Sequence, residues 1–138
     1  MRNKAILLSF LLSFLTAQPS SLFTAKLIED NLDRVESVIS VDLDQDGDID
    51  VVYAVYGSDK IQWEKNDGNQ NFTKIDFGGN SKSPGVQVAD MDNDGDLDIV
   101  SVSAFDDTVA WYENNGAANP TFTAANIVTN LDHAYGVY

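Results

Sequence analysis

Hydrophobic residues in this chain form short runs between turn-forming residues, and they follow no helical period. The runs are rich in valine, isoleucine and aromatic residues, which favour β-strands. The run at 49–55 is nearly continuous, as is typical of a strand buried on both faces. The pattern predicts an all-β chain with eight strands, at 35–41, 49–55, 61–65, 72–76, 86–89, 97–104, 109–113 and 122–128.

The pattern also repeats. The segment VDLDQDGDIDVV, whose acidic run begins at Asp42, matches ADMDNDGDLDIV, whose run begins 48 residues later at Asp90. Trp63 matches Trp111 at the same offset. Four strands in each repeat of this length are typical of β-propeller blades. We therefore expect four-stranded antiparallel blades, with repeat one at about 34–77, repeat two at about 83–129 and partial repeats at both ends.

The partial repeats at the two ends indicate whether the chain can form a complete propeller. The run at 22–28 resembles the fourth strand of a blade, and it either completes the last blade of a ring or is a plain leading strand. Gly136-Val137 resembles Gly85-Val86, as if a further repeat began there. Two complete repeats cannot close a ring. The sequence is thus expected to be a fragment, an open arc of a propeller from which further blades of the chain are missing, or else a chain that needs other copies to complete a ring.

Residues 1–17 have the order of a signal peptide. A positive start at Arg2 and Lys4 precedes an apolar run from Ala5 to Leu15, and small residues follow at Thr16-Ala17. A buried N-terminal helix is the alternative. The run is short for a membrane span and no second one follows. The order predicts a secreted protein, extracellular or at the cell surface, with the periplasm also possible, and residues 18–138 as the propeller part.

Charge is concentrated in two places. The chain has 22 Asp and Glu against 8 Lys and Arg, a formal net charge of −14. No basic stripe exists to meet phosphates, which argues against a nucleic-acid partner. Ten aspartates fall in the two repeated loops, where like charges repel unless a cation neutralises them. They are Asp42, Asp44, Asp46, Asp48, Asp50, Asp90, Asp92, Asp94, Asp96 and Asp98.

The spacing Asp-x-Asp-x-Asp-Gly-Asp-x-Asp predicts two calcium sites, one per complete repeat. Calcium takes six to eight oxygen ligands, and a loop of this spacing can wrap one ion. We expect side chains at positions 1, 3 and 5 to point inward, position 7 to offer its carbonyl and position 9 to close the site. Gly47 and Gly95 allow the sharp turn, and Gln45 and Asn93 are expected to face solvent.

Other kinds of acidic loop fit this motif less well. An EF-hand needs Glu at position 12 and a helix on each side. Position 12 is Tyr53 in one repeat and Ser101 in the other, and strands flank both loops. A solvated acidic hairpin or a run of Asx turns is the remaining alternative.

The combination of buried strand, DxDxDGDxD loop, apolar strand, Trp-x-x-Asn-(Asp/Asn)-Gly hairpin and Phe-Thr resembles the FG-GAP or VCBS-type repeat. That family is similar to the propeller of integrin α chains. The resemblance covers about residues 22–138. It implies a propeller, commonly of seven blades, with calcium in the loop that joins the first two strands of a blade, and an extracellular role in binding or adhesion.

Two classes of function follow. One is a secreted calcium-binding scaffold, not an enzyme, that binds an extracellular protein or a carbohydrate. The alternative is a partial or non-catalytic portion of a calcium-dependent propeller enzyme such as a polysaccharide lyase. A single histidine, His133, permits no histidine triad or zinc cluster and is expected to be exposed. Trp63 and Trp111 are expected to pack between blades, with sugar stacking as the alternative.

Overall fold

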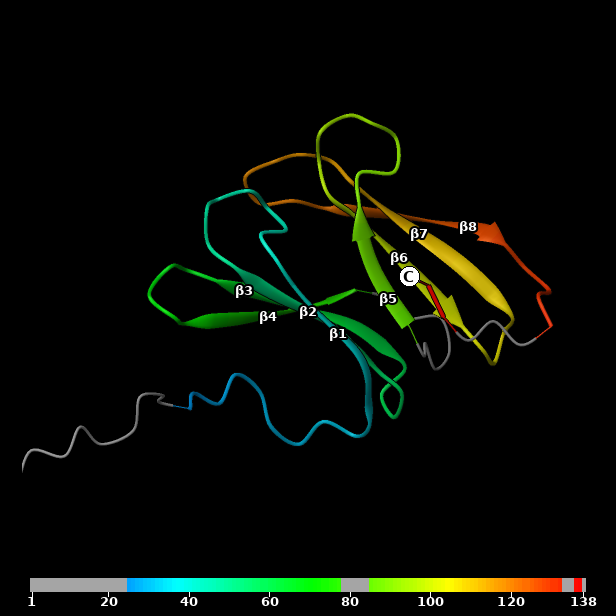
Figure 1. The fold of residues 1–138 in the computed structure, drawn as a ribbon, viewed down its shortest axis with the longest axis horizontal. Helices are drawn as coiled ribbons and strands as arrows, with labels where there is room; N and C mark the ends of the chain where they lie inside the picture. The colour runs from blue at the N-terminus through cyan, green and yellow to red at the C-terminus, as the bar shows by residue number, and fades with distance from the viewer. Residues whose placement is uncertain (1–24, 78–84, 133–135, 138) are drawn as a thin grey trace, which may run out of the picture.

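The computed structural model describes residues 25–77, 85–132 and 136–137, so the predicted signal peptide and His133 lie outside the described residues. The described residues form eight β-strands and no helix (Figure 1). The strands are β1 (Val35–Val41), β2 (Asp50–Val55), β3 (Lys60–Asn66), β4 (Phe72–Phe77), β5 (Gly85–Ala89), β6 (Asp98–Ser103), β7 (Thr108–Asn114) and β8 (Phe122–Val128).

The strands form two antiparallel sheets of four, each in the order of the sequence, β1-β2-β3-β4 and β5-β6-β7-β8. Each sheet thus has the four-stranded meander of a propeller blade. The predicted strands are confirmed, with ends that differ by at most one residue.

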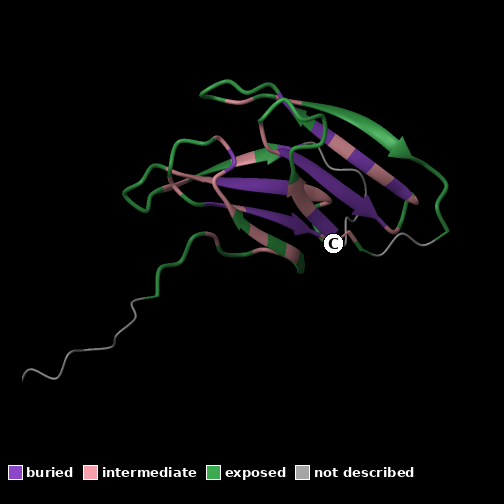
Figure 2. Ribbon diagram, turned by 45° about the horizontal axis from the view of Figure 1, so that its top comes forward, coloured by how far each residue is buried: buried purple, intermediate pink, exposed green. Residues whose placement is uncertain are grey.

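Burial within each sheet follows the strand order. All six residues of β6 are buried, and so are five of the six residues of β2. By contrast, β8 is exposed along almost its whole length (Figure 2). The inner strands therefore carry the continuous apolar runs of the sequence, as strands covered on both faces do.

The two sheets pack face to face through an aromatic cluster. Trp63 is 1% exposed and stacks on Phe77 at 6.3 Å between ring centroids. Phe122 of the second sheet contacts both rings edge-on, at 6.3 Å from Trp63 and 4.6 Å from Phe77. Tyr112 lies 6.5 Å from Phe77. The packing role predicted for Trp63 is confirmed, and large aromatic surfaces are the main source of burial energy at such contacts.

The opposite face of the first sheet is polar. Side chains alternate between the faces of a strand, so Tyr53, Gln62 and Glu64 point away from the second sheet. Glu64 accepts a hydrogen bond from the Tyr53 hydroxyl at 2.8 Å. Residues at the same register of the second sheet are Ala110 for Gln62 and Tyr112 for Glu64. The first blade thus has charge where the second has an apolar contact surface.

The strand predicted at 22–28 is wrong for its described part, because residues 25–28 form no strand. This segment is held instead by side chains: Lys26 bonds to the carbonyl oxygen of Gln70, and Glu29 pairs with Lys74 at 2.5 Å. Leu27 stays 72% exposed.

At the other end, residues 136–137 lie against β5, with Val137 packed beside Gly85. β5 itself lies beside β1, where the Ser37 hydroxyl donates to the carbonyl oxygen of Val86 at 3.4 Å. The segment that resembles the start of a repeat is therefore placed next to β5 much as β5 is placed next to β1. Within the described residues, no helix long and apolar enough to cross a membrane is found.

Candidate metal centre

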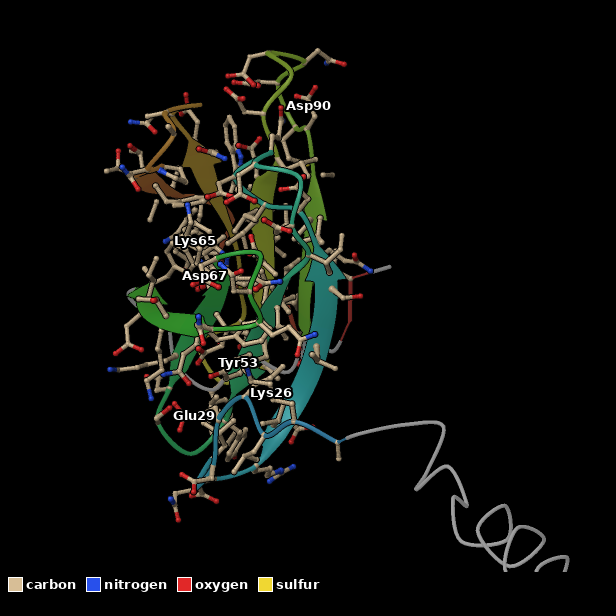
Figure 3. All side chains as sticks on the ribbon, turned by 90° about the vertical axis from the view of Figure 1, so that its left-hand side faces the viewer. Lys26, Glu29, Tyr53, Lys65, Asp67 and Asp90 are labelled. Carbon is tan, nitrogen blue, oxygen red and sulfur yellow. The ribbon has the colours of Figure 1, made fainter. Side chains whose placement is uncertain are left out.

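Both acidic loops lie on one side of the molecule, where β1 turns into β2 and β5 into β6 (Figure 1). Along the long axis of Figure 3, Asp90 and Lys65 lie toward the loops, and Tyr53 and Glu29 lie toward the opposite end. The meander places the first connection of each blade at the same edge, so the two loops become neighbours. The side-chain amide of Gln45 donates to the carbonyl oxygen of Gly95 at 2.7 Å. Gln45 is exposed, as expected, but it also links the two loops.

Backbone hydrogen bonds close each loop around its first aspartate. In the first loop, the carboxylate of Asp42 accepts the amides of Asp46 and Gly47, both at 3.0 Å. In the second, Asp90 accepts the amide of Gly95 at 3.2 Å. Both glycines have a φ of +98°, which residues with a side chain rarely adopt. The glycine in the motif therefore permits the turn, as predicted.

Carboxylates converge in both loops. One oxygen from each of Asp42, Asp44 and Asp50 lies within 4.8 Å of the others. The second loop brings together Asp90, Asp92 and Asp94 in the same way. Hard oxygen ligands at this separation suit calcium, which binds oxygen at roughly 2.3–2.6 Å. Six of the ten predicted ligands are thus in the clusters, and the ligand set itself stays a prediction.

Position 9 has a second role that the sequence did not show. Asp50 and Asp98 are fully buried, at 0% and 1% exposed. Each accepts two backbone amides: Asp50 from Leu43 at 3.2 Å and Asn66 at 2.8 Å, and Asp98 from the equivalent residues at 3.0 and 2.8 Å. Burial raises the pKa of Asp50, and these amides oppose the shift. Position 9 therefore ties the loop to the hairpin of its own blade.

Position 7 lies outside both clusters. The side chains of Asp48 and Asp96 lie against the hairpin glycines Gly68 and Gly116, where a Cβ atom would collide with them. Their carbonyl groups stay the predicted ligands. Asp46 is likewise outside its cluster and accepts the amide of Asp48 at 3.0 Å.

An asparagine at the end of β3 and of β7 supports each loop. The side-chain amide of Asn66 donates to the carbonyl oxygen of Ile49 at 3.1 Å, and that of Asn114 to Leu97 at 3.0 Å. Each side-chain oxygen also accepts the amide of the hairpin glycine two residues later. The exact repeat of this asparagine at the 48-residue offset was a signal in the sequence for this role.

One carboxylate of the first cluster is buried and only partly satisfied by its neighbours. The Asp44 side chain is 0% exposed, and its Oδ1 atom is buried without a hydrogen-bond partner. Its Oδ2 atom forms an ion pair with Lys65 from β3. The Asp44 carboxylate raises the pKa of Lys65 through this contact. A buried carboxylate oxygen without a donor is costly and is the position that a cation would satisfy.

Electrostatics in the second cluster also favour a cation. Partial desolvation raises the pKa of Asp92, and the charges of Asp94 and Asp98 shift it in the same direction. The residues present thus fit a calcium ion in both loops. When bound there, calcium would supply positive charge to the carboxylates and hold the connection between the first two strands of each blade.

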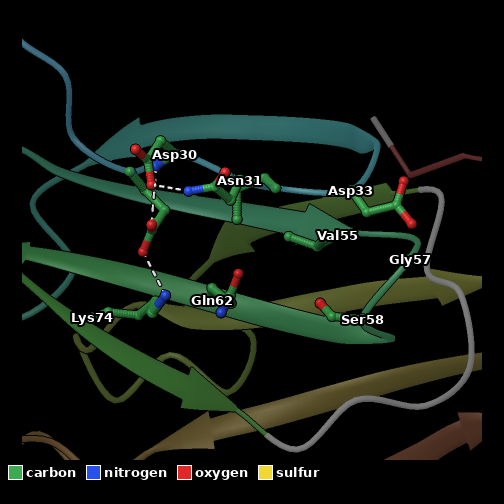
Figure 4. Close-up of a pocket in the computed structure, with 10 residues that line it drawn as sticks. Asp30, Asn31, Asp33, Val55, Gly57, Ser58, Gln62 and Lys74 are labelled. Atoms are coloured by element: carbon green, nitrogen blue, oxygen red, sulfur yellow. Dashed lines mark hydrogen bonds and ion pairs between the residues drawn. The ribbon is translucent and has the colours of Figure 1, made fainter.

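The structure has a hollow at the metal loops and another at the opposite end of the first sheet. A cavity of about 270 Å³ separates the first loop from the β7–β8 hairpin, and Asp44, Gln45, Asp96 and Asn114 line it. A second, of about 420 Å³, lies between the segment 29–33 and the polar face of the first sheet (Figure 4). Its lining includes Asp30, Asp33, Gln62 and Lys74. Both are lined largely by polar groups, and the first joins the two metal loops.

Comparison with known proteins supports the reading of the repeats. A model of the FG-GAP-like repeat matches residues 42–101, from the first acidic loop into β6. No protein of curated function and no solved structure matches the sequence. The matched segment contains the first blade after β1 and the whole second acidic loop. The chain therefore carries an FG-GAP-like repeat at residues 42–101.

Proposed function

We propose that this protein is a secreted, calcium-binding propeller scaffold that mediates binding outside the cell, and that it is not a catalyst. One observation carries the calcium part. The buried Asp44 carboxylate has an oxygen with no partner, in a loop whose carboxylates converge and whose pattern recurs 48 residues later. Repeats of the FG-GAP type typically occur in extracellular proteins, which supports the location together with the signal-like N-terminus.

The two sheets are, in this proposal, successive blades of a ring. Propellers have four to eight blades, so further blades would complete the ring. The calcium loops would stiffen one end of each blade, and nearby loops would contact a protein or a carbohydrate. The cavity between Asp44 and Asn114 lies at that end and offers polar groups to such a partner.

Calcium titration by calorimetry tests the proposal. The full chain should take up two ions, with dissociation constants on the order of 10⁻⁴–10⁻³ M or tighter. Asp42→Asn should weaken uptake by the first loop alone, and Asp90→Asn by the second alone. Each is the matched control for the other, because the two residues hold equivalent positions.

Thermal unfolding provides the second measurement. Calcium should raise the melting temperature, because a ligand that binds only the folded state stabilises it by mass action. Magnesium should have a smaller effect, because it holds its waters and demands a tight octahedral shell. No heat of calcium binding and equal melting in calcium and chelator would overturn the proposal.

A further inference from the structure

The two loops differ in their contact with a cationic side chain. Among the ion pairs of the described residues, only those of Lys65 reach an acidic loop. Its ammonium group contacts Asp44 Oδ2 and lies 3.7 Å from Asp46 Oδ2. Lys65 therefore already supplies positive charge to the first loop.

The second loop has the opposite charge at the equivalent place. Lys65 lies on β3 opposite Thr73, and Glu113 lies on β7 opposite Thr123. Both precede the asparagine that supports the loop by one residue. The strand beside the second loop thus presents a carboxylate where the strand beside the first presents an ammonium group.

We propose that Lys65 is a built-in counter-ion of the first loop that competes with calcium there, so that the loop at 90–98 binds calcium first and more tightly. This inference rests on the proposed function. Lys65 holds the Oδ2 atom of Asp44, the carboxylate whose Oδ1 atom a cation would satisfy, and its charge repels a cation at short range. Calcium must bind the first loop against this charge, whereas no ion pair of the described residues reaches the second loop.

Solvent exposure acts in the other direction but is the smaller effect. The clustered carboxylates of the second loop are exposed, so water screens their attraction for a cation more than in the first loop. A full positive charge in direct contact with a ligand carboxylate outweighs this difference, since it repels the ion at close range in a site that water screens less. Without calcium, Lys65 also keeps the first loop partly neutralised, and the second loop is the one that depends on the ion.

Calorimetric titration of the chelator-treated full chain with calcium chloride tests the inference. The wild type should bind in two steps with dissociation constants that differ about tenfold or more. Asp42→Asn should weaken only the weaker step and Asp90→Asn only the tighter one. Lys65→Met, which keeps an unbranched side chain and removes the charge, should tighten the weaker step about tenfold.

Two further variants make the result specific. Lys60→Met is the matched control, because Lys60 lies on the same strand but pairs with Asp76, and it should leave both steps unchanged. Glu113→Lys should weaken the tighter step about tenfold, and it decides the matter if Lys65→Met does not fold. In chelator, Lys65→Met should melt below the wild type and gain more on adding calcium.

The outcomes separate the two proposals. Two equal steps, or a first-loop affinity that neither Lys65→Met nor Lys60→Met changes, would overturn the role of Lys65 and leave the calcium function standing. Absence of any calcium uptake would overturn both.

Discussion

The buried carboxyl group of Glu64, on the polar face of the first sheet, shows how one residue sets a pH dependence of stability. Glu64 is 2% exposed, and burial raises the pKa of its carboxyl group. The charges of Glu29 and Asp76 shift it in the same direction, and the hydrogen bond from Tyr53 opposes them. Because the folded-state pKa is raised, the folded state favours protonated Glu64. Its stabilising contribution is full at low pH and is lost as pH rises through the folded pKa.

Glu64→Gln should therefore stabilise the protein at pH 7.5. Glutamine keeps an acceptor for the Tyr53 hydroxyl and removes the buried charge, for a gain on the order of 1 kcal/mol. Urea unfolding of both proteins at pH 4 and 7.5 measures the change, and the gain should shrink at the lower pH. A variant that is less stable than the wild type at pH 7.5 would contradict this account.

At the scale of the element, the hairpins depend on one asparagine each. Asn66→Ala and Asn114→Ala each remove a donor to a loop carbonyl group and an acceptor for a glycine amide. Losing the two exposed bonds of Asn66 should cost about 0.5–1.5 kcal/mol, and losing the two partly buried bonds of Asn114 about 1–3 kcal/mol. Chemical unfolding should show losses of these sizes.

Asn69→Ala is the control for the hairpins. The amide of Asn69 makes only an exposed bond, to the carbonyl oxygen of Asp67 at 3.3 Å. Its loss should change the free energy of unfolding by less than about 0.5 kcal/mol. Equal losses for Asn69→Ala and Asn66→Ala would mean that the asparagine at the strand end does not hold the loop.

At the scale of the whole molecule, stability depends on the contact between the sheets. A four-stranded blade cannot cover its own faces and buries them against its neighbours. Trp63 lies in this contact, whereas its equivalent in the second sheet, Trp111, is only half-buried. Trp63→Ala should cost about 3–5 kcal/mol, as for other buried aromatics, and Trp111→Ala clearly less.

Thermal or urea unfolding of the two tryptophan variants measures this difference. Trp63→Ala should also broaden the transition, because the sheets then unfold less as one unit. Similar losses at both positions would show that the sheet contact adds little to the local packing of each tryptophan.

Much of the fold could be predicted from the sequence, because strands and turns depend on neighbouring residues. The valine- and isoleucine-rich runs and the Asn-x-Gly hairpins specify the eight strands, and the 48-residue offset specifies the two blades. The acidic loops could also be predicted, because the aspartates and the glycine of each loop lie within nine residues of sequence. At 25–28, however, the local pattern favoured a strand that the structure does not contain.

Only the tertiary structure decided which residues meet across strands and blades. The pairing of Lys65 with Asp44 depends on how β3 passes beside a loop 21 residues earlier in the chain, and the link from Gln45 to Gly95 depends on how two blades stack. The sequence determined that carboxylates gather in two loops. It did not determine that Asp44 of the first loop is buried beside a lysine while the clustered carboxylates of the second loop are exposed, because that difference arises from sheet register and from the packing of one blade on the next.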